Sequence, residues 1–312
     1  MKIDIDRACE ILYKGGVVAM PTETVYGLAA SIESHEGINK IFSTKERPFF
    51  DPLIVHIASV EMAKDLVYSW PKVADVLAKA FWPGPMTMIL KKNHSVNDLI
   101  TSGLDSVGIR CPNHPIALNL ISQMGHGLAA PSANKFTKTS PTTSSHVKDE
   151  FGDKVMILEG GSCEIGIEST IIGISDDTLK IFRPGKITLE EIQMVLEKEN
   201  INSDISYAKS PVAPGQLEHH YMPDAPIVLV EDQEQLKDSN LPSELLNNPT
   251  FWKLKDDPAM VARELYAKFR ELSKDKPSAI IIEVKKDTLN DQAWHGIWNR
   301  LTKASSFNLL SK

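Results

Sequence analysis

Between residues 1 and 195, short apolar runs alternate with segments that have the composition of helices. The apolar runs are rich in β-branched residues and end at Gly, Pro, Ser or Asp, which predicts strands in GGVVAMP, PLIVHIAS, MTMILKK, SVGIRCP, GLAAPS, KVMILEGG, STIIGIS and LKIFRPG. Helices are predicted between them, among others in EMAKDLVYS, KVADVLAKAF, IALNLISQM and TLEEIQMVLEKEN. This interleaving favours an α/β or α+β domain with one sizeable mixed sheet.

The pattern changes over residues 200–225, which are polar and contain several prolines. We expect this stretch to be a linker of extended backbone. After it, APIVLVED and SAIIIEVKK are typical of strands, and QAWHGIWNRLTKASSFNLLSK is typical of a terminal helix. A chain of 312 residues is long for a single core. The sequence therefore predicts a larger domain over 1–199, the linker over 200–225 and a smaller α/β domain over 226–312.

Charge and cysteine content limit the possible binding partners and the cellular location of the protein. The formal net charge is −7, from 34 Lys and Arg against 41 Asp and Glu, which argues against a broad basic surface for duplex nucleic acid but allows a small positive pocket. Three scattered cysteines without a CxxC pair suggest neither disulfides nor a zinc site. The sequence has no signal-peptide pattern and no apolar run long enough for a bilayer, so we expect a cytoplasmic protein without a membrane partner.

Common nucleotide and hydrolase motifs are missing, since the sequence has no GxGxxG, P-loop, HExxH or GxSxG. A phosphate site would have to collect side chains from several strand ends. Lys45 and Arg47 in STKERP would converge on one anion if that segment is extended. The alternative is an exposed basic turn that ends the helix GINKIFSTK. Arg110 and Arg183 end predicted strands, where open α/β sheets usually bind ligands.

Other polar residues allow two interpretations each. His56 in the run LIVHI is either a core histidine or a catalytic one. Thr22, Glu23 and Thr24 form either ordinary turn hydrogen bonds or a site for a small polar ligand. The segment APSANKFTKTSPTT has six hydroxyl side chains, two lysines and no carboxylate, so it is either a surface loop or a ligand-binding segment. Neighbouring histidines in EHHY would point to opposite sides of an extended linker, so we expect no metal site there.

Read in order, PTETVYGLAA, STKERPFFDPLIVHI, FWPGPMTMIL, VGIRCP, AAPSANKFTKTSPTT, IESTIIGI and IFRPG resemble the YrdC-like family of L-threonylcarbamoyl-AMP synthases over about residues 5–195. SPVAPGQLEHHYMPDAP and IWNRLTKAS resemble the linker and C-terminal domain of the long, two-domain form. The resemblance implies a twisted mixed sheet with helices, joined by an extended linker to a smaller α/β domain. It also implies that L-threonine, bicarbonate and ATP, with Mg²⁺, give threonylcarbamoyl-AMP and pyrophosphate for the N6-threonylcarbamoyladenosine of tRNA.

The resemblance also implies roles for individual residues. The positions that match ATP-binding residues of the family are Lys45, Arg47, Asp51, Ser106, Ser132, Asn134, Ser140, Arg183 and Tyr221. The positions that match threonine-binding residues are Thr24, His56, Arg110, Ala130 and Ser169. Lys45 and Arg47 would be catalytic through the phosphates, Arg110 would pair with the threonine carboxylate, and no metal would be held by the protein itself. The linker, with His220 and Tyr221, would close over ATP, and the second domain would act with it as a lid.

Two residues depart from the family pattern, because Asp51 replaces asparagine and Glu46 replaces glycine in many members. A carboxylate near a triphosphate is unfavourable unless magnesium bridges the two or the side chain turns outward. The product would pass to the transferase complex that modifies tRNA, with direct tRNA contact as a further possibility. Two other functions stay open: a module that binds RNA or a nucleotide without catalysis, and a carbamoyl transfer role like that of YrdC-like domains in hydrogenase-maturation proteins.

Overall fold

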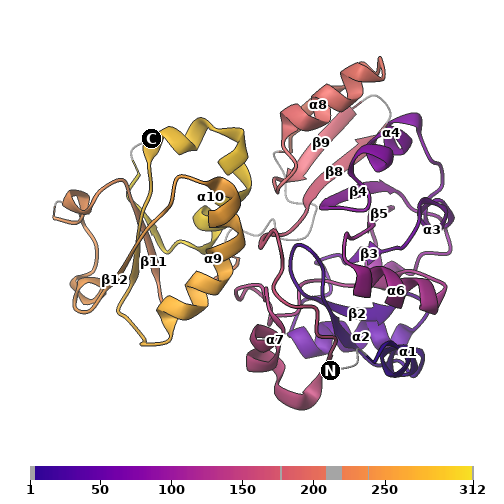
Figure 1. Ribbon diagram of the computed structural model, residues 1–312, viewed down its shortest axis with the longest axis horizontal. Coiled ribbons are helices and arrows are strands. Elements are labelled where there is room, and N and C mark those ends of the chain that lie inside the picture. Colours follow the sequence, from indigo (N-terminus) through magenta and orange to yellow (C-terminus); the bar gives the residue numbers. More distant parts are fainter. Residues whose placement is uncertain (1–3, 176–177, 209–219, 238, 311–312) are drawn as a thin grey trace.

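The computed structural model describes residues 4–175, 178–208, 220–237 and 239–310, which form two packed α/β units (Figure 1). The mixed α/β architecture and the smaller second unit confirm the fold expected from the sequence. None of the helices in these described ranges has both the length and the apolar character that a membrane crossing requires.

The first unit is built on a ten-stranded sheet, counted over the described residues, with strand order β10-β9-β8-β4-β5-β3-β6-β2-β1-β7. Its strands are β1 (Val18–Met20), β2 (Gly27–Ser31), β3 (Ile54–His56), β4 (Met86–Lys91), β5 (Ser106–Arg110), β6 (Leu128–Ala129), β7 (Met156–Ile157), β8 (Thr170–Ser175), β9 (Thr178–Arg183) and β10 (Asp204–Tyr207). The sheet is mixed, because it contains parallel pairs such as β3 with β5 and antiparallel pairs such as β4 with β5.

Helices cover this sheet and bury its apolar side chains. They are α1 (Ile5–Tyr13), α2 (His35–Lys45), α3 (Val60–Leu66), α4 (Lys72–Phe81), α5 (Asp98–Thr101), α6 (Pro115–Met124), α7 (Ser144–Phe151) and α8 (Leu189–Lys198), and a 3-10 turn follows α7 at Gly152–Lys154. The largest core cluster joins buried residues of α2, α3, α4 and α8 to Val55 and Ile109 of the sheet. A second cluster packs α1 and α6 against β1. Side chains alternate along a strand, so the neighbours of Val55 and Ile109 point to the other face of the sheet.

The second unit has four parallel strands in the order β12-β13-β11-β14 over its described residues. Its strands and helices are β11 (Ile227–Val230), β12 (Thr250–Lys253), α9 (Pro258–Ser273), β13 (Ile280–Glu283), α10 (Gln292–Ala304) and β14 (Phe307–Asn308), with 3-10 turns at Gln233–Leu236, Ser243–Leu246 and Lys286–Asn290. Helices α9 and α10 face the first unit (Figure 1). Val25 and Ile167 of the first unit belong to the same core cluster as these helices, so the two units share apolar packing.

Several elements differ from the sequence expectation, among them helix α9 and strand β12, where the sequence analysis predicted no element. Strand β2, with the sequence GLAAS, was not predicted, although the equally small-residue stretch GLAAPS was. Strand β10 lies inside the predicted linker and pairs in parallel with β9, so the linker begins by extending the sheet. The terminal helix ends at Ala304, and the following Phe307–Asn308 pairs with β11.

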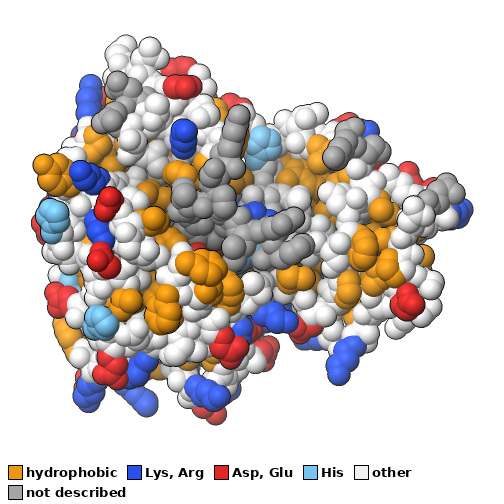
Figure 2. Space-filling view, turned by 180° about the vertical axis from the view of Figure 1, so that it is seen from behind, with side chains coloured by type: hydrophobic (Ala, Val, Ile, Leu, Met, Phe, Trp, Pro, Cys, Tyr) orange, Lys and Arg blue, Asp and Glu red, His pale blue; other side chains and the backbone are white. Residues whose placement is uncertain are grey.

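Lys and Arg side chains are interspersed with Asp and Glu on the face opposite to that of Figure 1 (Figure 2). Among the described residues on this face, the positive side chains do not merge into one broad patch. The mixed distribution agrees with the acidic balance of the sequence, in which 41 acidic residues exceed 34 basic ones.

Candidate active site

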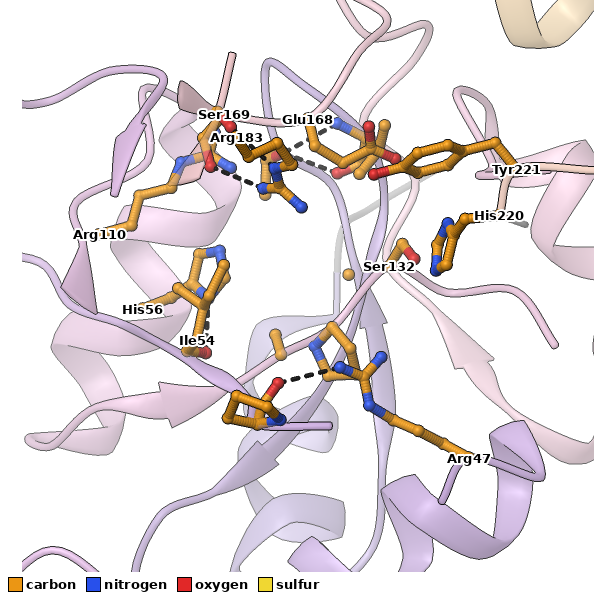
Figure 3. A pocket seen from close by; sticks show the side chains of 16 residues that line it. Arg47, Ile54, His56, Arg110, Ser132, Glu168, Ser169, Arg183, His220 and Tyr221 are labelled. Carbon is orange, nitrogen blue, oxygen red and sulfur yellow. Dashed lines mark hydrogen bonds between the residues drawn. The ribbon is translucent and has the colours of Figure 1, made fainter. Parts of the chain in front are cut away.

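A polar pocket opens where the ends of several strands of the first unit meet the end of the linker (Figure 3). Its lining residues are Thr22, Val25, Gly27, Arg47, Pro52, Ile54, His56, Arg110, Ala130, Pro131, Ser132, Glu168, Ser169, Arg183, His220 and Tyr221. Eight of the fourteen residues that match ATP- or threonine-binding positions of the family are on its wall: Arg47, His56, Arg110, Ala130, Ser132, Ser169, Arg183 and Tyr221. Thr22 and His220, which the sequence analysis also named, line it as well. The pocket therefore joins side chains that lie far apart in the chain.

The register between two parallel strands brings His56 and Arg110 together. Strands β3 and β5 pair with His56 opposite Arg110, at the carboxyl end of both strands. Arg110 is buried, its Nη2 lies 2.7 Å from Glu23 Oε1, and its Nε donates to the Gly84 carbonyl oxygen at 3.3 Å. Glu23 therefore holds one side of the guanidinium, and a ligand carboxylate would bind to the rest of the fork.

His56 is an uncharged member of the pocket wall. Burial, and then the charge of Arg110, lower the pKa of His56 to about 3, so its ring is neutral near pH 7. Its Nδ1 lies 3.3 Å from the carbonyl oxygen of Ile54. Because a carbonyl accepts, the proton of the neutral ring belongs on Nδ1, which leaves Nε2 as an acceptor.

Arg183 ends β9 and is fixed against the start of β8. Its Nε donates to the Ser169 carbonyl oxygen at 3.1 Å, and its Nη2 donates to Ser169 Oγ at 3.2 Å. Ser169 Oγ is also 2.8 Å from Thr87 Oγ1 of β4. These contacts orient a buried cation at the pocket wall, beside a serine hydroxyl.

Arg47 follows the end of α2. In Figure 3 it lies across the pocket from Arg110 and Arg183. Its Nη2 is 2.8 Å from Asp51 Oδ2 and 2.9 Å from the Pro52 carbonyl oxygen, to which it donates. Its Nε donates to the Asp51 carbonyl oxygen at 3.1 Å. The Asp51 carboxylate is thus paired with Arg47. Glu46 points outward, with 71% of its side chain exposed, and pairs with Lys135.

Lys45 is the last residue of α2 and is buried behind the wall of the pocket. The extended segment expected for STKERP is wrong, because α2 continues to Lys45. The alternative, a basic turn that ends the helix, is right about the helix end and wrong about exposure, since Lys45 and Arg47 are buried. The Nζ of Lys45 donates to the carbonyl oxygens of Ser132, at 2.5 Å, and Asn134. Burial, and then the charge of Arg47, lower the pKa of Lys45 well below its usual value.

Four further residues selected from the sequence lie outside the pocket lining. Asn134 turns its Nδ2 to the carbonyl oxygens of Lys135 and Lys138, at 2.7 and 2.8 Å. Thr24 is buried, with its Oγ1 2.9 Å from Thr22 Oγ1. Ser140 Oγ donates to Glu168 Oε1 at 2.6 Å, and Ser106 lines a small neighbouring cavity. That cavity shares Pro52 and Ile54 with the pocket, so the two spaces adjoin.

The end of the linker closes one side of the pocket with two rings. Tyr221 has a left-handed backbone, with φ 65°, and its ring stacks on Tyr266 of α9 at a centroid distance of 5.7 Å. His220 lies beside Tyr221, with ring centroids 4.1 Å apart. The other linker residues selected from the sequence, including His219 and the Pro-Gly pair, lie outside the described residues.

Glu168 is a member of the site that the sequence analysis did not select. Its Oε2 accepts from the Tyr266 hydroxyl at 2.8 Å and from Arg300 Nε at 3.0 Å, both in the second unit. Burial raises the pKa of Glu168, but Arg300, Arg183 and hydrogen bonds outweigh this effect and lower it to about 2. Its place before Ser169 in the EST motif was the available signal, whereas Arg300 lies in IWNRLTKAS, whose resemblance indicated a domain and no site residue.

Comparisons with known proteins agree with this architecture. Residues 10–185 match the family model Sua5_yciO_yrdC, described as "Telomere recombination", and residues 187–306 match the model "Threonylcarbamoyl-AMP synthase, C-terminal domain". The threonylcarbamoyl-AMP synthase of Pyrococcus abyssi is 36% identical over 324 residues, which cover 97% of this chain and 94% of the relative. The synthase of Bacillus subtilis is 41% identical over 230 residues, which cover 73% and 66%.

A solved structure extends the likeness to three dimensions. The crystal structure of P. abyssi Sua5 complexed with L-threonine has a TM-score of 0.86 and 34% identity, over 97% of this chain and 95% of that one. The similarity thus covers both units as well as the pocket region between residues 22 and 221. From sequence and structure together, this chain belongs to the Sua5/YrdC family of threonylcarbamoyl-AMP synthases.

Proposed function

We propose that this chain condenses L-threonine, bicarbonate and ATP into L-threonylcarbamoyl-AMP and pyrophosphate. One observation carries the proposal within the family: three buried arginines, Arg47, Arg110 and Arg183, line a single pocket. An amino-acid carboxylate next to a triphosphate needs several such cations, and guanidinium groups suit both anions because they donate two parallel hydrogen bonds.

The threonine half of the pocket would lie around Arg110. Its guanidinium would bind the substrate carboxylate, while Glu23 keeps the fork in one orientation. His56 and Ser169, with Thr24 and Ala130 behind them, would surround the amine and the side chain. The neutral His56 ring supports this arrangement, because it adds an acceptor without a second positive charge near the amine.

The ATP half would extend from Arg47 and Arg183 to Ser132 and Tyr221. The adjoining cavity with Ser106 would hold the nucleoside end, and Asp51, Asn134 and Ser140 would shape these walls through their contacts with other residues.

Magnesium would arrive with the phosphates of ATP. Among the described residues there is no group of three or more His, Cys, Asp or Glu side chains fit to hold a metal ion. Within the described ranges, the lining carboxylate of Glu168 pairs with Arg300 and the nearby Asp51 pairs with Arg47, which supports magnesium bound through the phosphates.

Two steps would give the product. The threonine amine attacks the carbon of bicarbonate, water leaves, and a carbamate forms. A carbamate oxygen then attacks the α-phosphorus, the bond to the bridging oxygen breaks, and pyrophosphate leaves. The protein contributes positioning and fixed positive charge near the developing negative charge. Hydrogen bonds that hold Arg47 and Arg183 in the pocket support this role for the two arginines.

The surroundings of the reaction complete the proposal. The linker end, with His220 and Tyr221, would limit the access of water to the adenylate, together with the second unit.

The product would pass to a transferase that modifies an adenosine of tRNA. The free, buried cysteines Cys9, Cys111 and Cys163 support a cytoplasmic setting.

A direct assay tests the function. The purified chain is mixed with ATP, Mg²⁺, bicarbonate and L-threonine, and pyrophosphate is measured over time. We expect release that needs both threonine and bicarbonate. A protein that only binds nucleotides would give none, and this result would overturn the proposal. Arg47→Ala should remove most of the release while its circular dichroism stays that of the parent.

A further inference from the structure

The three residues at the end of α2 leave the helix in three directions. Glu46 has a left-handed backbone, with φ 55°, and the Arg47 amide donates back to the Phe42 carbonyl oxygen at 2.9 Å. This reversal sends Arg47 into the pocket and Glu46 to the surface, while Lys45 points into the protein. Two cations separated by one residue therefore have different surroundings.

Lys45 is fastened to a single segment of chain, residues 132–136. Its Nζ donates to the carbonyl oxygens of Ser132 and Asn134, and its own carbonyl oxygen accepts from the Phe136 amide at 2.8 Å. The side chain is 1% exposed, and Lys45 is not among the residues that line the pocket. If the Lys45 amino group were removed, its two buried carbonyl acceptors would lose their donor. Buried polar groups without partners cost free energy of folding.

The neighbours of Lys45 fasten the same segment. Glu46 pairs with Lys135, and the Arg47 guanidinium lies 6.0 Å from the centroid of the Phe136 ring. The end of α2 thus contacts the segment at each of these positions. Lys45 and Arg47 are both buried, and of these two only Arg47 lines the pocket. The chain just before and within this segment supplies Ala130 and Ser132 to the pocket wall.

We propose that Lys45 is a positioning residue that holds residues 130–136 in place, so that Ala130 and Ser132 keep the pocket in shape for both substrates. The inference rests on the proposed function, because it assigns threonine to the side of Ala130 and nucleotide to the side of Ser132. It gives Lys45 a role different from direct contact with phosphates. The two roles differ in one measurable respect, which is the binding of threonine without any nucleotide.

Lys45→Met tests this role, since methionine has a similar length and no donors. L-Threonine binding is measured by calorimetry without nucleotide, and pyrophosphate binding is measured separately. We expect both dissociation constants to rise about tenfold, as for the loss of a charge-assisted hydrogen bond. In steady state the KM for threonine should rise with them, whereas a residue needed only for folding would lower the active fraction and leave KM unchanged. Threonine affinity within about twofold of the parent, with weakened pyrophosphate binding, would overturn the proposal.

Lys45→Arg provides a second measurement of threonine binding, which does not depend on whether the methionine variant folds. It keeps the charge but places a larger, planar group in a site without free space, so it should displace the segment and weaken threonine binding at least threefold. If Lys45 instead contacts a phosphate, the arginine should take over that contact and threonine binding should stay unchanged. Unchanged threonine binding would therefore count against the positioning role.

Lys40→Met is the matched control, because Lys40 lies on the same helix α2, its side chain is 43% exposed and it pairs with Glu36 of that helix. Its threonine and pyrophosphate affinities should stay within twofold of the parent, and a loss equal to that of Lys45→Met would contradict a specific role for Lys45. The proposed function fails separately: it fails if the parent protein neither binds threonine nor releases pyrophosphate in its presence.

Discussion

Arg300 Nε lies 3.0 Å from Glu168 Oε2, and this ion pair joins the second unit to the wall of the active-site pocket. Arg300 is completely buried, and its Nη2 donates to the Glu168 main-chain carbonyl oxygen at 3.1 Å. Its Nη1 donates to the carbonyl oxygen of Pro184, next to Arg183. The second unit thus supports the two chain segments that carry Ser169 and Arg183.

Removal of this arginine should destabilise the protein strongly. Arg300→Met leaves Glu168 buried without its ionic partner, and loss of one member of a buried pair costs about 3–5 kcal/mol. Urea denaturation would measure this loss, and pyrophosphate release should fall because Ser169 and Arg183 lose support. The double variant Arg300→Met with Glu168→Gln should recover part of the stability, since it also removes the charge. The exposed Arg7→Met is a control, and a loss below about 1 kcal/mol in Arg300→Met would contradict the role of the pair.

The low pKa of Glu168 predicts a dependence of stability on pH. The folded pKa of about 2 is below the ordinary value of 4.5, so the ionised carboxylate stabilises the folded state above pH 4.5. This contribution is lost as the pH falls from 4.5 towards 2. Between pH 5 and pH 3 the loss should be about 2 kcal/mol.

Glu168→Gln isolates that contribution, because glutamine keeps the shape and does not titrate. The difference in unfolding free energy between parent and variant should shrink by about 2 kcal/mol from pH 5 to pH 3. Urea titrations of both proteins at each pH measure it. A difference that stays constant over this range would show that the carboxylate pKa is not lowered by folding.

Arg110 and Arg47 should separate the two halves of the pocket in kinetics. Arg110→Lys loses the planar fork beside Glu23, so the KM for threonine should rise about tenfold or more while the KM for ATP changes less than about twofold. Arg47→Lys should show the opposite pattern. Initial rates of pyrophosphate release at varied threonine and varied ATP give both constants. Equal changes of both constants in both variants would refute the division of the pocket.

Sequence patterns predicted the residues at the strand ends well. They predicted poorly the long-range contacts that hold the pocket wall in place. Arg110 and Arg183 end β-branched runs bounded by turn residues, and such local signals placed both on the pocket wall. The partners of Glu168 leave no local signal, because Arg300 is 132 positions away and belongs to another unit. For Lys45 the sequence predicted either a phosphate-binding cation or part of an exposed basic turn. Neither prediction included its burial against residues 132–136, because the left-handed turn at Glu46 decides which way each side chain of the KER triplet points.

Gly166 should be required for the close approach of the two units. Its backbone has φ +83°, and a Cβ there would lie 2.5 Å from the Ala262 carbonyl oxygen and 2.5 Å from the Arg263 Cα, both in α9. Gly166→Ala therefore combines backbone strain of about 1 kcal/mol with a clash against backbone that cannot move without shifting α9.

Gly103→Ala is the matched control for this clash, because Gly103 has a similar φ of +77° and no atom within 4 Å of the added Cβ. The alanine at 103 should cost about 1 kcal/mol of unfolding free energy, from backbone strain alone. The alanine at 166 should cost clearly more and should also lower pyrophosphate release, since a displaced α9 moves Tyr266 away from Glu168. Urea denaturation measures the unfolding free energy of both variants, and initial rates measure their pyrophosphate release. Equal losses of stability, with equal activity, would mean that the contact between Gly166 and α9 does not support the site.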